Sequence, residues 1–104
     1  MGVITLTSDW GLKDYYLSSV KGMIYQHYPE ARIVDISHEI QPFNINEAAY
    51  ILQNAYKSFP DGTVHLIGLN SEESIDSPHV AALFDKQYFI GTDNGIFSLI
   101  FEGQ

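Results

Sequence analysis

The feature that most constrains the fold is an alternation of short β-branched runs with longer stretches of helical spacing. The runs at 3–7, 32–36 and 63–69 are typical of buried strands. Between them, apolar residues recur every three or four positions over 14–27 and again from residue 44, which predicts a helix in each place. Short connections between such elements imply right-handed crossovers. The sequence therefore predicts an α/β fold, a three-layer sandwich around a mainly parallel sheet.

Local signals indicate where the second helix begins and where the pattern changes. Asn44 can cap a helix, and Glu47 follows three residues later, as in a capping box. Further along, 79–84 and 87–91 predict two strands joined by a tight hairpin at 85–86. A parallel β-α-β-α-β unit is thus expected to end in an antiparallel hairpin, with a last apolar segment after it.

Composition excludes several classes of partner. The 104 residues suit a single domain over 1–104, and 45% of them are hydrophobic. A net charge of −8 argues against nucleic acid and against anionic membranes. The absence of cysteine excludes disulfides and thiolate metal sites. No targeting segment is visible, so we expect a cytoplasmic protein. The acidic residues of 70–78 match no metal loop, and no metal site is predicted.

Three segments follow strand ends, where ligands bind in open α/β sheets. They are Ser8-Asp9-Trp10-Gly11, 38–43 and 69–71. Asp9 fits two roles equally well, because its carboxylate could accept hydrogen bonds from a ribose diol or cap a turn. The segment at Ser8–Gly11 is the first candidate for ligand contact.

Other residues of these segments have competing interpretations. Trp10 and Phe43 could stack on a flat ring, although packing in the core is the commoner role of such side chains. His38 could act as a base, but histidines in loops are more often structural. Residue patterns alone therefore predict a small α/β domain with a polar, aromatic-walled site at the strand ends.

A resemblance to a known family rests on five ordered motifs, at 4–14, 34–40, 47–50, 59–65 and 93–95. The chain resembles the S-adenosylmethionine hydroxide adenosyltransferases, relatives of the fluorinases and chlorinases. Those enzymes displace methionine from the ribose C5′ of S-adenosylmethionine with water or a halide, without a further cofactor. The resemblance implies an N-terminal α/β domain, a homotrimer in the full-length protein, and a C-terminal β domain that is absent from this sequence.

The resemblance also implies roles for particular residues. Asp9 matches the aspartate that binds the ribose hydroxyls, and Phe43 matches an aromatic position near the ribose. Asp93 and Asn94 match a turn near the substrate. Asn70 stands where the family has a water-orienting aspartate, and an amide cannot act as a base.

Two further departures concern the hydrolytic groups. The family arginine falls near 77–78, where this chain has Ser-Pro, and a family histidine lies in a segment beyond residue 104. We therefore expect the N-terminal part of an adenosyltransferase-like protein that is inactive by itself. The alternative is a diverged, non-catalytic domain that binds an adenosyl or other nucleoside compound, or serves in assembly.

Overall fold

The computed structural model describes residues 2–9, 11, 15–41, 44–68, 79–92 and 96–101. Every predicted strand and helix is present, with ends shifted by one or two residues. The last apolar segment, for which the sequence indicated no type, is a helix. The elements in order are β1 (Val3–Ser8), α1 (Tyr16–His27), β2 (Arg32–Ser37), α2 (Ile45–Ala55), η1 (Tyr56–Ser58), β3 (Val64–Gly68), β4 (His79–Phe84), β5 (Gln87–Thr92) and α3 (Ile96–Phe101).

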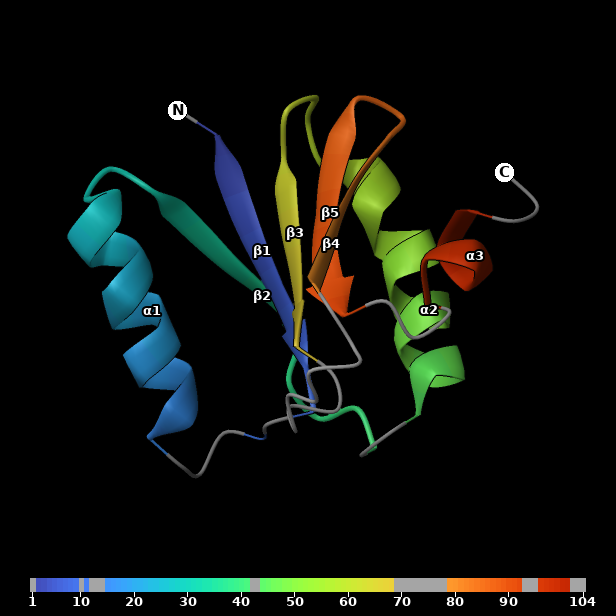
Figure 1. Ribbon diagram of the computed structural model, residues 1–104, viewed down its shortest axis with the longest axis horizontal. Coiled ribbons are helices and arrows are strands. Elements are labelled where there is room, and N and C mark those ends of the chain that lie inside the picture. The colour runs from blue at the N-terminus through green and yellow to red at the C-terminus, as the bar shows by residue number, and fades with distance from the viewer. Residues whose placement is uncertain are drawn as a thin grey trace.

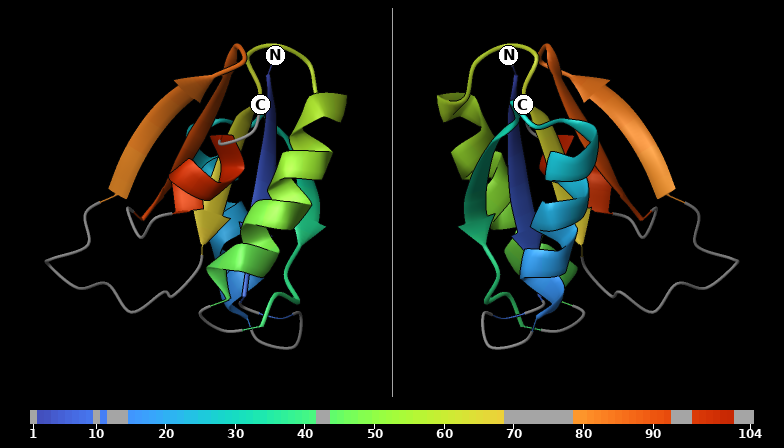
Figure 2. Two further views of the ribbon diagram at one scale, coloured as in Figure 1. Left: turned by 90° about the vertical axis from the view of Figure 1, so that its right-hand side faces the viewer. Right: turned by 90° about the vertical axis from the view of Figure 1, so that its left-hand side faces the viewer.

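The strands form one five-stranded sheet in the order β2-β1-β3-β5-β4. β1 runs parallel to both β2 and β3, and β3 runs parallel to β5. β4 pairs with β5 antiparallel through the hairpin. Helix α1 lies on one face of the sheet, while α2 and α3 lie on the other (Figures 1 and 2). The predicted three-layer α/β architecture is confirmed.

The order of the strands places a topological switch point between β1 and β3. The chain leaves β1 through α1 to reach β2 on one side, then returns through α2 to β3 on the other side. The two helices consequently lie on opposite faces, as Figure 1 shows. Ser8 and Gly68, the last residues of β1 and β3, are paired in the sheet. Ligands of open α/β sheets bind at the carboxyl ends of strands at such a point.

The two faces of the sheet are packed unequally. The buried core lies between the sheet and the layer of α2, η1 and α3, whereas α1 has no buried residue. Met23 of α1 is 60% exposed and Tyr28, next to its end, is 61% exposed. None of the helices in the described ranges is long and apolar enough to cross a membrane. The core residues are Ile40, Ala48, Ala49, Leu52, Tyr56, Ile67, Phe89, Ile96 and Ile100.

The start of α2 follows the capping prediction with one change. The Asn44 side chain accepts a hydrogen bond from the Glu47 N–H at 3.0 Å, as predicted. The Glu47 carboxylate, however, accepts from the Gln41 N–H at 2.9 Å, because the Asn44 N–H already donates to the Gln41 carbonyl. These bonds join Gln41 to the first turn of α2.

Candidate functional site

Asp9 lies at the switch point, immediately after β1. Its backbone N–H donates a long hydrogen bond, 3.4 Å, to the carbonyl oxygen of Gly68 at the end of β3. The residue is half-buried. The structure thus places Asp9 at the sheet edge where the sequence predicted a ligand.

The second predicted segment meets the first through His38. The His38 ring Nδ1 lies 2.5 Å from the Ser8 hydroxyl oxygen, and both side chains are buried. The His38 carbonyl oxygen accepts the Gly11 N–H at 2.7 Å. The segments that follow β1 and β2 therefore converge, as predicted, and His38 is the residue that joins them.

The other ring nitrogen of His38 contacts the ion pair of Asp35 and Lys21. His38 Nε2 is 2.8 Å from Asp35 Oδ1 of β2, and the other oxygen of that carboxylate is 2.6 Å from Lys21 Nζ of α1. Desolvation works against the charge of Asp35, but hydrogen bonds from Lys21 and His38 outweigh it and lower the pKa of Asp35. The carboxylate is consequently ionised at neutral pH.

Ser8, His38 and Asp35 form a hydrogen-bonded series of the kind that activates a serine nucleophile. The Ser8 side chain is, however, fully buried. A nucleophile must reach a substrate carbonyl, and this hydroxyl is covered by protein. The series therefore fits the support of a loop, and acyl transfer does not follow from it.

Sequence reasoning treated His38 as an isolated loop residue and missed its partners. The available signal was the spacing of Asp35 and His38, three residues apart across the end of a strand. Within the described ranges, no group of three or more histidine, aspartate or glutamate side chains could hold a metal ion. The other predicted site residues lie outside the described residues: Trp10, Phe43, Asn70, Asp93 and Asn94.

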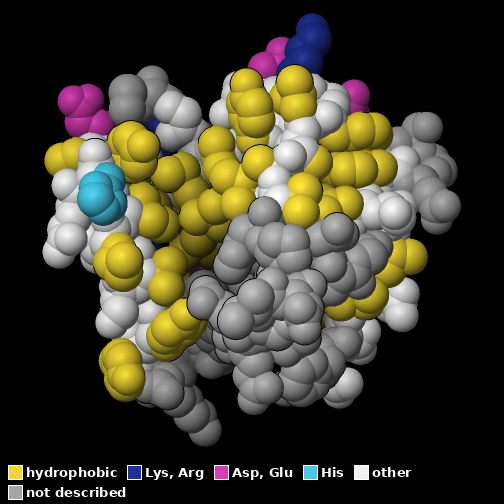
Figure 3. All heavy atoms as spheres, in the orientation of Figure 1, with side chains coloured by type: hydrophobic (Ala, Val, Ile, Leu, Met, Phe, Trp, Pro, Cys, Tyr) yellow, Lys and Arg dark blue, Asp and Glu magenta, His cyan; other side chains and the backbone are white. Residues whose placement is uncertain are grey.

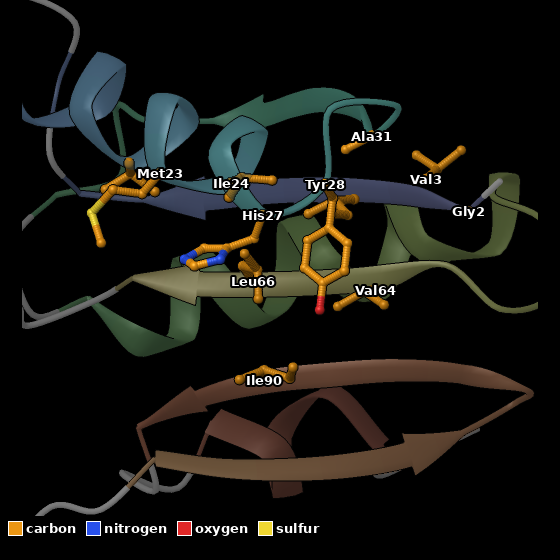
Figure 4. Close-up of a pocket in the computed structure, with 12 residues that line it drawn as sticks. Gly2, Val3, Met23, Ile24, His27, Tyr28, Ala31, Val64, Leu66 and Ile90 are labelled. Carbon is orange, nitrogen blue, oxygen red and sulfur yellow. The ribbon is translucent and has the colours of Figure 1, made fainter.

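An apolar cavity of about 620 Å³ lies between α1 and the sheet, away from this edge. Hydrophobic side chains gather over α1 and the sheet, and the surface is hollowed between them (Figure 3). Figure 4 shows Ile24 and His27 of α1, and Tyr28 just after it, above Val64 and Leu66 of β3. The walls of this cavity are almost wholly apolar, and the cavity lies nearer the amino ends of β1 and β3 than their carboxyl ends. It therefore does not suit a charged nucleoside.

Comparison with known proteins identifies the family. A sequence model of the SAM hydroxide adenosyltransferase N-terminal domain matches residues 4–104. The chain belongs to the SAM hydroxide adenosyltransferase family. The candidate site at the carboxyl ends of β1 and β2 accordingly lies in an N-terminal domain of this family.

Proteins that are similar to this chain include relatives whose names fit this family. An (R)-S-adenosyl-L-methionine hydrolase of Methanocaldococcus jannaschii is 35% identical to this chain, over 98% of the chain and 40% of the hydrolase's own length. A fluorinase of Nocardia brasiliensis is 36% identical over 60% of the chain and 21% of its own length. A crystal structure of an uncharacterized conserved protein from Thermotoga maritima superposes with a TM-score of 0.86 at 35% identity, covering 93% of this chain and 37% of that one. The chain therefore spans about two-fifths of the hydrolase and of that structure.

Proposed function

We propose that this chain is the N-terminal part of a SAM hydroxide adenosyltransferase-like protein and binds the adenosyl group at the carboxyl ends of β1 and β3. One observation carries the proposal. Asp9, which matches the family's ribose-binding aspartate, lies at the switch point between β1 and β3 and is linked there to Gly68. That is the place where open α/β sheets bind nucleotides.

The charge of the ligand fits the charge of the chain. A carboxylate at Asp9 accepts hydrogen bonds from two neighbouring hydroxyls, which matches a ribose diol. S-adenosylmethionine carries a sulfonium cation, and the chain has a net charge of −8. The field of an acidic domain favours the approach of such a cation. Both arguments support an adenosyl sulfonium as the ligand.

We assign binding to residues 1–104 and turnover to a longer chain. In the family reaction, an oxygen–C5′ bond forms as the C5′–sulfur bond breaks, methionine leaves with the electron pair, and the water loses a proton. At position 70 this chain has an asparagine, whose neutral amide does not take that proton, so turnover by a longer chain requires another group as the base. The relatives with hydrolase activity are also about two and a half times as long.

The second candidate is a non-catalytic domain that binds a nucleoside or serves in assembly. The amide at Asn70 and the Ser-Pro at 77–78 favour it, because both replace charged residues of the hydrolases. The two candidates share the Asp9 site and differ in turnover. A measurement of turnover therefore distinguishes the two candidates, whereas a measurement of binding does not.

Calorimetry with adenosine tests the shared site. Asp9→Ala is expected to weaken adenosine binding by about tenfold to a hundredfold, since hydrogen bonds to a charged group are worth roughly 1.5–3 kcal/mol. Asp61→Ala, in an exposed turn, is the matched control and should bind like the wild type. With 2′,3′-dideoxyadenosine, wild type and Asp9→Ala should bind equally. Unchanged adenosine affinity in Asp9→Ala would contradict ribose binding and would favour the alternative that Asp9 caps a turn.

Chromatography of incubations with S-adenosylmethionine tests turnover. Residues 1–104 are expected to release neither adenosine nor methionine, while a chain of the relatives' length releases both. Release by residues 1–104 would refute the need for more chain. A full-length chain that binds adenosine without releasing methionine would establish the non-catalytic alternative.

A further inference from the structure

His38 is attached to both ends of the segment Ser8–Gly11. Its ring Nδ1 meets the Ser8 hydroxyl at 2.5 Å, and its carbonyl oxygen accepts the Gly11 N–H at 2.7 Å. Asp9 lies between these two attachments. Fixing the backbone on both sides of Asp9 lowers the conformational entropy that a bound ligand would otherwise have to remove.

The neighbours of His38 determine which ring nitrogen carries the proton. An ionised carboxylate only accepts hydrogen bonds, so Nε2 carries a hydrogen and donates it to Asp35 at 2.8 Å. The Lys21 ammonium, 2.6 Å from the same carboxylate, favours the ionised form. In the neutral ring, Nδ1 is then an acceptor, and the Ser8 hydroxyl donates to it. Helix α1 and strand β2 thereby orient the ring toward Ser8.

We propose that His38 is a positioning residue that holds Ser8–Gly11 so that the Asp9 carboxylate meets the ribose hydroxyls. The proposal rests on the proposed function, since it takes the ribose as the ligand. The side chains of Ser8 and His38 are buried, so they act through the backbone of Asp9 and do not touch the ligand. Asp35 and Lys21 keep the ring in its accepting orientation.

Two amide substitutions separate the two contacts of the ring. The carboxamide oxygen of His38→Asn lies near the position of Nδ1 and can accept from Ser8, whereas His38→Gln reaches toward Asp35. Both variants keep the main-chain bond to Gly11. We expect His38→Gln to weaken adenosine binding about tenfold, the loss of one hydrogen bond, and His38→Asn to retain it. Equal losses in the two variants would indicate general packing and overturn the proposal.

A double substitution tests whether His38 acts through Asp9. In the Asp9→Ala background, His38→Gln is expected to cause no further loss of adenosine affinity, because the group that it positions is gone. A further tenfold loss there would show independent contributions and would contradict the proposal.

Hydrogen exchange of the ligand-free protein tests the attachment without any nucleoside. The Asp9 and Gly11 amide protons are expected to exchange about tenfold faster in His38→Gln than in the wild type, and at the wild-type rate in His38→Asn. Equal exchange in all of these proteins overturns the proposal while leaving adenosine binding by Asp9 in place. A wild-type chain that binds no adenosine overturns the proposed function and the positioning role with it, whatever the exchange rates.

Discussion

At the scale of single residues, the sheet contains a second histidine whose environment contrasts with that of His38. His65 of β3 is fully buried between Thr5 and Gln87, with each ring nitrogen 2.6 Å from its partner. The Gln87 amide nitrogen donates to the carbonyls of Tyr56 and Phe59, so its oxygen faces the histidine. Both hydrogen-bond partners of this ring are uncharged, and desolvation lowers the pKa of His65.

This lowered pKa predicts a loss of stability in weak acid. Below the ordinary value of 6.5, the unfolded chain binds a proton at His65 that the folded chain does not, so the free energy of unfolding falls. The loss grows until the pH reaches the lowered folded pKa. We expect urea unfolding of His65→Gln to depend less on pH between 8 and roughly 5 than that of the wild type. His27→Gln, at an exposed position, should retain the wild-type slope, and an equal slope in His65→Gln would contradict the assignment.

At the scale of elements, the hairpin between β4 and β5 has an unfavourable residue in its turn. Asp85 and Lys86 have φ values of 54° and 64°, as a primed two-residue turn requires. The Asp85 carboxylate accepts a hydrogen bond from the buried Tyr56 hydroxyl at 3.0 Å, which gives this residue a function in the core. Lys86 has a side chain in a backbone region that favours glycine.

Lys86→Gly is therefore expected to stabilise the protein. The substitution creates the preferred Asp-Gly pair and relieves left-handed strain, which together are worth about 0.5–1 kcal/mol after the added flexibility of the unfolded chain. The Gly62 N–H still donates to the carbonyl of residue 86. Lys57→Gly, in the short helix η1, is the control and should destabilise the protein. A lower urea midpoint for Lys86→Gly than for the wild type would show that the turn is not strained.

The elements that the sequence predicted well are those defined by local chemistry. The cap at Asn44 and the hairpin at 85–86 depend on neighbours a few residues away, and both are confirmed. The sequence predicts no type for 96–101, because five of its six residues are apolar and carry no clear period. Its helix becomes evident when Ile96 and Ile100, four residues apart, enter the core beside α2. Tertiary packing, and not the sequence of the segment itself, therefore determines that 96–101 is helical.

At the scale of the whole molecule, the candidate site likewise has one part that the sequence predicts and another that it does not. The position of Asp9 was predictable, because every parallel strand of a crossover unit ends at one edge. The contacts of His38 were not, because they join Ser8 to Asp35 and Lys21 from three different elements. Such contacts depend on the relative placement of α1 and β2. A family motif identifies the residues of a site, but it does not indicate which of their side chains are in contact.

The unequal faces of the sheet lead to a prediction that compares identical substitutions. Leu52 of α2 is fully buried in the core, whereas Leu17 of α1 is half-buried on the helix above the apolar cavity. Leu52→Ala removes packed methyl groups and leaves a cavity, so it should lower the free energy of unfolding by about 2–5 kcal/mol. Leu17→Ala loses only part of its transfer free energy and should cost under about 1 kcal/mol. Urea unfolding of the two variants measures the difference. Equal losses would mean that in solution α1 packs as tightly on its face of the sheet as α2 packs on the other.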